Sequence, residues 1–286
     1  MKNKLILGTV QFGLNYGINN NAGKPSDDEI EKILLTAYSN NVLFLDTAEA
    51  YGDSQKKIGQ FHLKHPEKKF NVITKFKENL NFTNIRQHVI NDLQELNLEK
   101  LYAYFFHNLS DLQKHLNNID DLLILKEKGL INKIGISLYT NDEIEEVLKN
   151  YKFIEIIQIP FNLFDNLNQR ETFLKKIKKA RIEVHTRSAF LQGLFFKKKI
   201  PDKLSVLQSY KILIDALCKN YFLSISELAL NYCLSQSLID KVLIGVDSEK
   251  QLIENINNIN KLDPEIIIRL NNIDVKEKEL LNPANW

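Results

Sequence analysis

Residues 133–159 read KIGISLYTNDEIEEVLKNYKFIEIIQI, and this stretch contains one complete strand-helix-strand unit. The runs 133–136 and 154–159 are short and mostly apolar, as expected of strands that are covered on both faces. Between them, residues 142–150 carry apolar side chains at helical spacing. Two strands joined by one helix are expected to run parallel, with a right-handed crossover.

The same alternation continues in both directions along the chain. Further candidate strands are 5–7, 43–45, 71–74, 101–106, 181–184 and 241–244. Further candidate helices are 27–40, 85–96, 111–129, 169–180, 205–221 and 248–259. Eight such units without a change in composition predict an α/β fold, a closed (β/α)8 TIM barrel that forms one domain over residues 1–286. No G-x-G-x-x-G turn follows an early strand, so a Rossmann crevice is not expected.

The composition excludes several classes of protein. The 286 residues include 38 basic and 36 acidic side chains, for a net charge of +2, and 44% are hydrophobic. These values are typical of a globular protein and differ from the basic excess of a nucleic-acid binder. No apolar run approaches the roughly 20 residues that cross a bilayer, and the N-terminus lacks a signal-peptide core. A soluble, cytoplasmic protein is therefore expected.

Neither a disulfide framework nor a metal site is predicted. Cys218 and Cys233 are too few for such a framework and are expected to pack as reduced thiols. Four histidines are expected on helix or loop surfaces without a carboxylate cluster beside them: His62, His65, His88 and His115. No pattern predicts the oligomeric state.

Polar residues terminate most of the predicted strands. Active sites of such barrels lie at the carboxyl ends of the strands, so these side chains are expected to share one face. In chain order they are Asp46, Lys75, His107, Ser137, Gln158, Arg187 and Gly245. The predicted active site therefore has an acid, a base and an imidazole at the ends of successive strands.

The turn after the second predicted strand, D-T-A-E-A-Y-G at 46–52, brings a tyrosine back over the barrel mouth. The ammonium of Lys75 would lower the pKa of Tyr51 and make its phenol a usable proton donor. Asp46 would hold Lys75 charged and in place. His107 would direct a substrate carbonyl toward Tyr51 through a hydrogen bond.

With these residues, the chain resembles the aldo-keto reductase superfamily, and its bacterial members in particular. The catalytic tetrad of that family matches Asp46, Tyr51, Lys75 and His107. Five further segments carry the resemblance: L-G-T-V-Q-F-G (7–13), I-G-I-S (134–137), I-I-Q (156–158), R-S-A-F-L-Q-G (187–193) and I-G-V-D-S-E-K-Q-L-I-E-N (244–255).

The resemblance implies a nicotinamide dinucleotide bound across the barrel mouth. Ser137 and Gln158 would hold its carboxamide, and Arg187 stands where many relatives stack an aromatic ring. The further cofactor contacts implied are Thr9, Asp46, Ser188, Ala189, Phe190, Gln192, Gly193, Gly245, Asp247, Gln251, Glu254 and Asn255. Family frequency favours NADP(H) over NAD(H). Asp247 argues for NAD(H), because its charge would repel a 2′-phosphate, although Lys250 could offset it.

The expected activity is NAD(P)H-dependent reduction of an aldehyde or ketone to an alcohol, with Tyr51 as general acid. The resemblance extends to a bacterial subgroup linked to carbohydrate metabolism, which suggests a sugar-derived substrate. The expected substrate contacts are Gln11, Tyr51, His107 and Asn108, with further walls from Val10, Tyr139, Asn162 and residues 282–286.

Other activities on this fold fit the sequence less well. A glycosidase would need two carboxylates, and only Asp46 ends a strand as an acid. A Schiff-base aldolase could use Lys75, but Asp46 would keep that amine charged. The alternative that stays open is a nucleotide-binding regulatory or interaction protein with little turnover. Potassium-channel β subunits resemble this type, but they replace the tetrad histidine that His107 supplies here.

Overall fold

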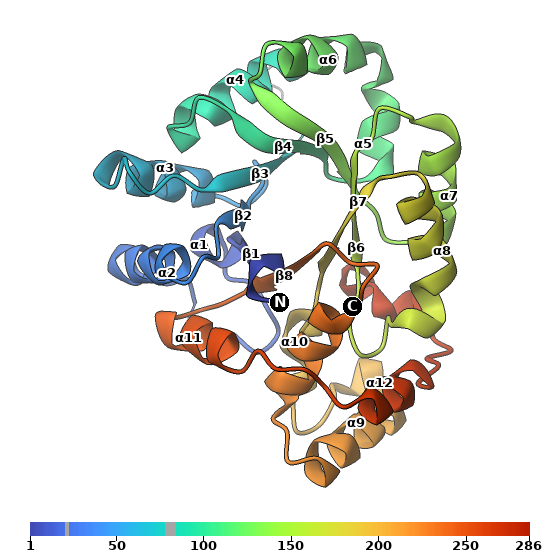
Figure 1. The fold of residues 1–286 in the computed structure, drawn as a ribbon. Coiled ribbons are helices and arrows are strands. Elements are labelled where there is room, and N and C mark those ends of the chain that lie inside the picture. The colour runs from blue at the N-terminus through green and yellow to red at the C-terminus, as the bar shows by residue number, and fades with distance from the viewer. Residues whose placement is uncertain (21–22, 78–83) are drawn as a thin grey trace.

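The computed structural model describes residues 1–20, 23–77 and 84–286, and the strands in this part of the chain close into one barrel (Figure 1). Each strand pairs in parallel with its neighbours in the sequence, and β1 pairs with β8 to close the ring. The strands are β1 (Leu5–Gly8), β2 (Phe44–Asp46), β3 (Asn71–Phe76), β4 (Leu101–Phe106), β5 (Ile131–Ser137), β6 (Ile156–Pro160), β7 (Glu183–Arg187) and β8 (Lys241–Gly245). The predicted (β/α)8 TIM barrel is confirmed.

The helices surround the barrel on its outside (Figure 1). They are α1 (Val10–Gly13), α2 (Asp27–Ser39), α3 (Ser54–Lys64), α4 (Ile85–Leu96), α5 (Leu109–Lys114), α6 (Ile119–Glu127), α7 (Asn141–Asn150), α8 (Leu167–Lys179), α9 (Gln208–Asn220), α10 (Ile225–Ser235), α11 (Glu249–Asn257) and α12 (Pro264–Asn271). Single 3-10 turns occur at Lys2–Lys4, Leu116–Asn118, Leu191–Phe196, Asp202–Leu207, Lys278–Leu281 and Pro283–Asn285.

Local sequence signals set several helix starts. Thr140 and Glu143 form a capping box at α7, in which each side chain bonds the backbone of the other residue. Ser26 caps α2 by accepting a hydrogen bond from the backbone N–H of Glu29 at 3.2 Å. These caps satisfy N–H groups that have no partner within the helix.

Several element boundaries differ from the prediction, among them the following three. The expected helix 111–129 divides into α5 and α6, with Leu116–Asn118 in a 3-10 turn between them. Two of these three residues are asparagines, which are weak helix formers. The expected strand 181–184 shifts to β7, because Arg181 takes a left-handed backbone (φ +60°) after α8. The expected strand 154–159 begins later, at Ile156 in β6.

Apolar spacing predicts none of α3, α10 and α12. For α10 the reason is its position, because every residue from Leu228 to Leu234 is buried. A helix that is buried on all sides has no polar face, so it lacks the alternation by which amphipathic helices are recognised.

The barrel interior is filled by a cluster of buried side chains. Ile6, Ile73, Ala103, Phe105 and Ile156 form this inner core, which is separate from the larger core between strands and helices. Gly135 provides room for the Phe105 ring on the neighbouring strand, since a Cβ at 135 would lie 2.2 Å from Cε1 of Phe105.

Polar side chains from three strands meet near the amino-terminal end of the barrel. Glu183 on β7 accepts hydrogen bonds from Tyr102 Oη at 3.0 Å and from Lys133 Nζ at 2.5 Å. His185 lies 2.8 Å from the other carboxylate oxygen of Glu183. Burial acts to raise the pKa of Glu183, but the His185 and Lys133 contacts outweigh it and lower that pKa to about 2. This ionised cluster ties β4, β5 and β7 together.

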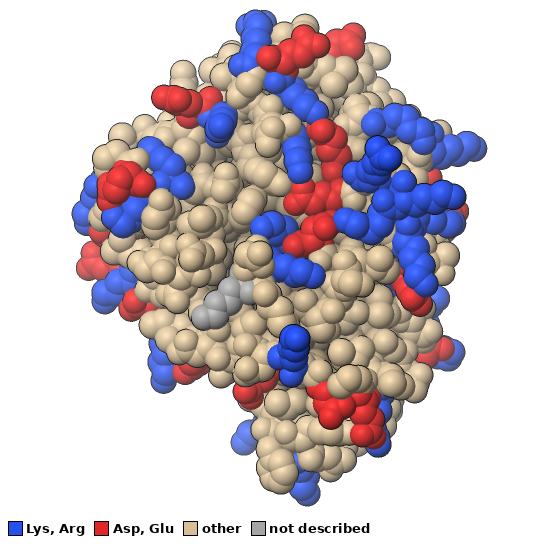
Figure 2. Space-filling view, viewed as in Figure 1, with Lys and Arg blue, Asp and Glu red and all other residues tan. Residues whose placement is uncertain are grey.

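The surface agrees with the near-neutral net charge. On the face shown in Figure 2, both basic and acidic side chains lie around the outline and right of the centre, with uncharged areas between them. Within the described ranges, no helix is long and apolar enough to span a membrane. The same residues hold no group of three or more His, Cys, Asp or Glu arranged to bind a metal, and Cys218 and Cys233 are both free thiols.

Candidate active site

A cavity of about 600 Å³ opens at the carboxyl ends of the barrel strands. Every residue predicted to contact cofactor or substrate, or to act in catalysis, lines this cavity, with one exception. Asn108 instead caps α5, where its Oδ1 accepts a hydrogen bond from the backbone N–H of Asp111 at 2.8 Å. Asn108 is therefore outside the cavity lining, and its contact with a substrate stays a prediction.

The four tetrad residues converge at one end of the cavity. Asp46 ends β2, Lys75 lies on β3, and the two side chains form a buried ion pair. Lys75 Nζ also donates to the carbonyl of Thr47 at 3.1 Å and lies 5.3 Å from the centre of the Tyr51 ring. The rings of Tyr51 and His107 are edge to face, with 6.0 Å between their centres. The phenol thus lies between an ammonium and an imidazole.

The loop that carries Tyr51 is held by the neighbouring backbone. The N–H of Thr47 donates to the carbonyl of Ile73 at 2.8 Å, and the N–H of Glu49 donates to the carbonyl of Lys75 at 3.2 Å. Gly13 packs directly against the loop, because a Cβ on Gly13 would lie 1.7 Å from the carbonyl oxygen of Tyr51. These contacts fix the loop against β3 and α1.

A buried network behind this loop was not predicted. The carboxylate of Glu49 lies 2.8 Å from His88 Nδ1 and accepts a hydrogen bond from Tyr104 Oη at 3.0 Å. Asp92 lies nearby, and burial, followed by the charge of Glu49, raises the pKa of Asp92 well above its ordinary value. The available signal was Glu49, a charged residue inside D-T-A-E-A-Y-G, the turn predicted to fold back over the barrel mouth.

The histidines behind the site correct another prediction. His62 and His88 are buried, contrary to the expected surface positions. His62 Nδ1 lies 2.8 Å from the carbonyl of Leu96, and burial lowers the pKa of His62 to about 4. His62 on α3 and His88 on α4 therefore each make a hydrogen bond inside the fold.

The protonation states of the site follow from burial. Burial raises the pKa of Tyr51, the Asp46 carboxylate raises it further, and Arg187 only partly opposes this. This direction is opposite to the expected lowering of the Tyr51 pKa, because burial of the phenol is the largest cause. Burial, followed by the charge of Lys75, lowers the pKa of His107 to about 4. At neutral pH the site holds a protonated phenol and a neutral imidazole.

The floor of the cavity has an unsatisfied acceptor. Gln158 donates from Nε2 to Asp46 Oδ2 at 2.8 Å, while its buried Oε1 has no partner among the described residues. Ser137 lies on the neighbouring strand, in register with Gln158. A primary amide with two N–H donors fits this position, and the carboxamide of nicotinamide is such a group.

The loop after β7 has an unusual backbone. Ser188, Leu191, Gln192 and Gly193 all have positive φ values, between 47° and 89°. Such conformations cost energy in residues other than glycine, and they concentrate at binding sites. This loop lines the cavity between β7 and β8.

The far end of the cavity, beside α11, is acidic. Asp247 Oδ1 accepts a hydrogen bond from Asn20 Nδ2 at 3.3 Å, and Glu254 lines the same region. Lys250 is 85% exposed and its Nζ lies 3.9 Å from Glu254. Lys250 is absent from the cavity lining.

Several lining residues were not predicted, among them Tyr16, Asn19, Asn20, Phe196 and Ser226. Pro283 and Ala284 also line the cavity and belong to the expected wall segment 282–286. Tyr16 and the two asparagines belong to the segment between α1 and α2, which carries no strand or helix pattern. Asn162, predicted as a wall, instead holds a turn by accepting hydrogen bonds from the backbone of Phe164 and Asp165 at 2.9 and 3.0 Å.

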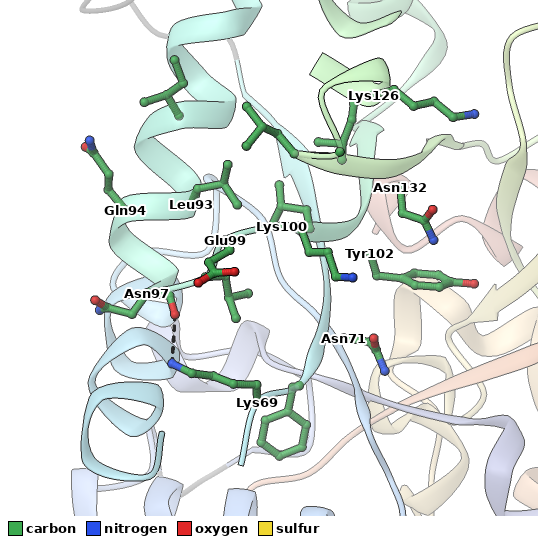
Figure 3. Close-up of a pocket in the computed structure, with 17 residues that line it drawn as sticks. Lys69, Asn71, Leu93, Gln94, Asn97, Glu99, Lys100, Tyr102, Lys126 and Asn132 are labelled. Atoms are coloured by element: carbon green, nitrogen blue, oxygen red, sulfur yellow. Dashed lines mark hydrogen bonds between the residues drawn. The ribbon is translucent and has the colours of Figure 1, made fainter. Parts of the chain in front are cut away.

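A larger hollow of about 1270 Å³ lies at the opposite end of the barrel strands (Figure 3). Lys69, Asn97, Lys100 and Tyr102 line it, and Lys69 donates to the carbonyl of Asn97 at 3.0 Å. None of the tetrad residues reaches this hollow. In barrels of this kind the chemistry takes place at the carboxyl ends, where the tetrad lies.

A sequence profile of the Aldo/keto reductase family matches residues 4–275 of the chain. The protein belongs to the aldo/keto reductase family. Members of this family are oxidoreductases that act on carbonyl compounds and use nicotinamide cofactors. The predicted family is therefore confirmed, and membership of it supports the prediction that the protein is an oxidoreductase.

Two curated relatives are similar to this chain over most of its length. The NADH-specific methylglyoxal reductase of Escherichia coli is 25% identical over 277 residues, which cover 79% of this chain and 81% of the relative. L-galactose dehydrogenase of Arabidopsis thaliana is 25% identical over 258 residues, which cover 84% and 81% respectively. The expected preference for NADP(H) is not supported, since the first of these relatives is specific for NADH.

Solved structures agree on the fold. The holo form of an aldo-keto reductase from Bacillus halodurans superposes with a TM-score of 0.75 at 19% sequence identity, covering 96% of this chain and 94% of that one. At this identity the similarity concerns the aldo/keto reductase fold alone.

Proposed function

We propose that the protein reduces an aldehyde or ketone to an alcohol with NADH, and that Tyr51 delivers the proton. The observation that carries this proposal is the convergence of Asp46, Tyr51, Lys75 and His107 in one cavity. The sugar-related relative and the polar lining around Gln11 and Asn20 support a hydroxylated, sugar-derived carbonyl compound as substrate.

The nicotinamide would supply the hydride to the carbonyl carbon when it is bound. Gln158 and Ser137 would hold its carboxamide, for which the unpartnered Oε1 of Gln158 is suited. Tyr51, protonated at neutral pH, gives its proton to the carbonyl oxygen as negative charge develops there. The neutral His107 donates a hydrogen bond to the same oxygen and orients it. Lys75, fixed by Asp46, stabilises the phenolate that remains.

The charge at the far end of the cavity supports NADH over NADPH. Asp247 and Glu254 line the region beside α11. The lysine and the arginine among the described lining residues, Lys75 and Arg187, lie at the catalytic end instead. A 2′-phosphate would be repelled here, while a 2′-hydroxyl can donate a hydrogen bond to Asp247.

Turnover by the Tyr51→Phe variant tests this function. With NADH and a panel that includes methylglyoxal and aldose sugars, kcat is expected to fall about a hundred- to ten-thousandfold, because the proton donor is lost. The Kd for NADH, measured by fluorescence quenching, is expected to stay unchanged. The matched control is Tyr38→Phe, which removes a hydroxyl that bonds the carbonyl of Glu67 far from the cavity.

Near-normal kcat in Tyr51→Phe would contradict the assigned role of Tyr51. Tight binding of NADH by the wild-type protein without turnover of any carbonyl would instead support the alternative, a nucleotide-binding regulatory protein.

A further inference from the structure

Of the two basic residues at the catalytic end of the cavity, Lys75 and Arg187, only Lys75 has an ion-pair partner among the described residues. Lys75 is neutralised by its ion pair with Asp46, and Asp247 and Glu254 lie at the far end beside α11. Arg187 lies at the catalytic end, and no carboxylate of a described residue comes within ion-pair distance of it. A half-buried guanidinium without a counterion attracts an anion into the cavity.

The direction of the Arg187 side chain indicates which part of a bound complex it faces. From the end of β7 it reaches across β6 to β5, where Nε donates to Ser137 Oγ and Nη2 to the carbonyl of Leu138, both at 3.3 Å. Its guanidinium lies 4.1 Å from the centre of the Tyr139 ring. This direction leads away from β8, where Asp247 would meet the adenosine half of the cofactor. The side chain of Arg187 points instead toward the side of the barrel where β4 lies. His107 directly follows β4 in the sequence.

The position of the guanidinium is supported from behind. Arg170 donates to the carbonyl of Tyr139 at 2.7 Å and is itself held by two 2.6 Å hydrogen bonds to the buried carboxylate of Asp165. The backbone of Tyr139, whose ring lies under Arg187, is therefore held in place without a ligand. Such preorganisation reduces the entropy lost on binding.

The guanidinium also keeps donors available. Of its five N–H groups, one on Nε and one on Nη2 have partners among the described residues, so the two on Nη1 and one on Nη2 remain. A planar group with parallel N–H donors matches the two oxygens of a carboxylate or phosphate.

We propose that Arg187 binds an oxyanion of the substrate, so that the preferred substrates are carbonyl compounds that carry a carboxylate or a phosphate. This inference rests on the proposed carbonyl reduction. It assigns Arg187 to the substrate, in addition to the nicotinamide contact expected from the sequence.

Two matched pairs of carbonyl compounds test it with NADH as reductant. Phenylglyoxylate is compared with its methyl ester, and glyceraldehyde 3-phosphate with glyceraldehyde, in the wild type, Arg187→Gln and Arg187→Lys. In Arg187→Gln the preference in kcat/KM for the anionic member is expected to fall about tenfold to a hundredfold. Arg187→Lys is expected to retain part of the preference for the anionic member, because lysine keeps the positive charge. The rest is expected to be lost, because lysine lacks the parallel N–H donors of a guanidinium. The pair that responds identifies the anion as carboxylate or phosphate.

The matched control is Arg86→Gln, which makes the same change at an exposed position on α4 and is expected to leave the preference unaltered. An equal preference in the wild type and Arg187→Gln would overturn the proposal. A loss of NADH affinity that lowers kcat/KM equally for acid and ester would also overturn it, because Arg187 would then act on the cofactor alone.

A binding measurement separates this inference from the proposed function. Calorimetric titration with phenylacetate and with phenyl phosphate, in the presence of NADH, needs no turnover. Binding that is lost in Arg187→Gln, from a protein that reduces no carbonyl, would retain the anion subsite and reject the reductase function. Binding that is identical in both proteins would reject the subsite whatever the turnover.

Discussion

At the scale of single residues, we propose that Asp247 sets the preference between NADH and NADPH. Replacing it in Asp247→Asn removes the charge that opposes a 2′-phosphate while keeping an acceptor oxygen. The ratio of kcat/KM for NADH over NADPH is expected to fall about tenfold. Steady-state kinetics with both cofactors measures this ratio.

The control for this change is Asp202→Asn, because Asp202 is 91% exposed and pairs with Lys199 outside the cavity. A ratio that is the same in Asp247→Asn and the wild type would show that Asp247 does not face the 2′ position.

Single residues also show how far the sequence allowed the site to be predicted. Strand-end positions located Asp46, Lys75 and His107, because parallel strands bring their carboxyl ends to one face. Asn108 also follows a strand, but its contact to Asp111 makes it a helix cap, for which the spacing N-x-x-D was the available signal. The pKa of Tyr51 was predicted in the wrong direction, because the sequence places a lysine beside it but does not reveal the extent of burial.

At the scale of elements, the loop between β2 and α3 connects the tetrad to the buried network behind it. Glu49 in this loop holds His88 and Tyr104, so we expect it to act as a positioning residue for Tyr51. In Glu49→Ala the loop loses this anchor, and kcat is expected to fall about tenfold or more while the Kd for NADH is kept. Steady-state kinetics and fluorescence titration measure the two quantities.

The variant Glu49→Gln keeps the shape and one acceptor oxygen, so it is expected to restore part of kcat. Glu171→Ala on the exposed face of α8 is the control for general stability. If Glu49→Ala and Glu49→Gln both kept wild-type kcat, the loop would be held by its backbone contacts alone.

Elements also differ in how well apolar patterns predict them. The amphipathic helices α2, α4 and α7 were predicted to within one or two residues. The fully buried α10 was missed because burial on all sides removes the polar face. The start of β7 was misplaced because the left-handed Arg181 is a backbone property that apolarity does not encode.

At the scale of the whole molecule, the charged cluster around Glu183 joins three strands of the barrel. The pKa of Glu183 is lowered to about 2 in the folded protein, below its ordinary value. A depressed carboxyl pKa stabilises the fold above the unfolded pKa of roughly 4.3, and this contribution is lost as the pH falls toward 2. Replacement by Glu183→Gln is expected to lower the free energy of unfolding at pH 7 by about 2 kcal/mol.

The same variant is expected to show a flatter dependence of stability on pH between about 5 and 2. Urea unfolding at several pH values measures both effects. Glu145→Gln removes a half-exposed partner of Lys176 and is expected to change stability by less than about 0.5 kcal/mol. Parallel pH profiles for Glu183→Gln and the wild type would mean that Glu183 is not the group responsible.

The barrel as a whole was predictable because its signal is repeated. Eight apolar runs separated by helical patterns leave few alternatives to a closed parallel sheet. The ionised cluster at its amino-terminal end was not predicted, because Tyr102, Lys133 and Glu183 are distant in sequence and meet only when the sheet closes.

The fit between Gly135 and Phe105 constrains how this interior can change over generations. Any larger residue at 135 meets the Phe105 ring, so a lineage that enlarges position 135 must first have acquired a smaller residue at 105. The reverse order passes through an overpacked intermediate that selection would remove. Adjacent positions on β4 and β5 are thus inherited as a pair, and descendants of this protein that vary one are expected to vary the other.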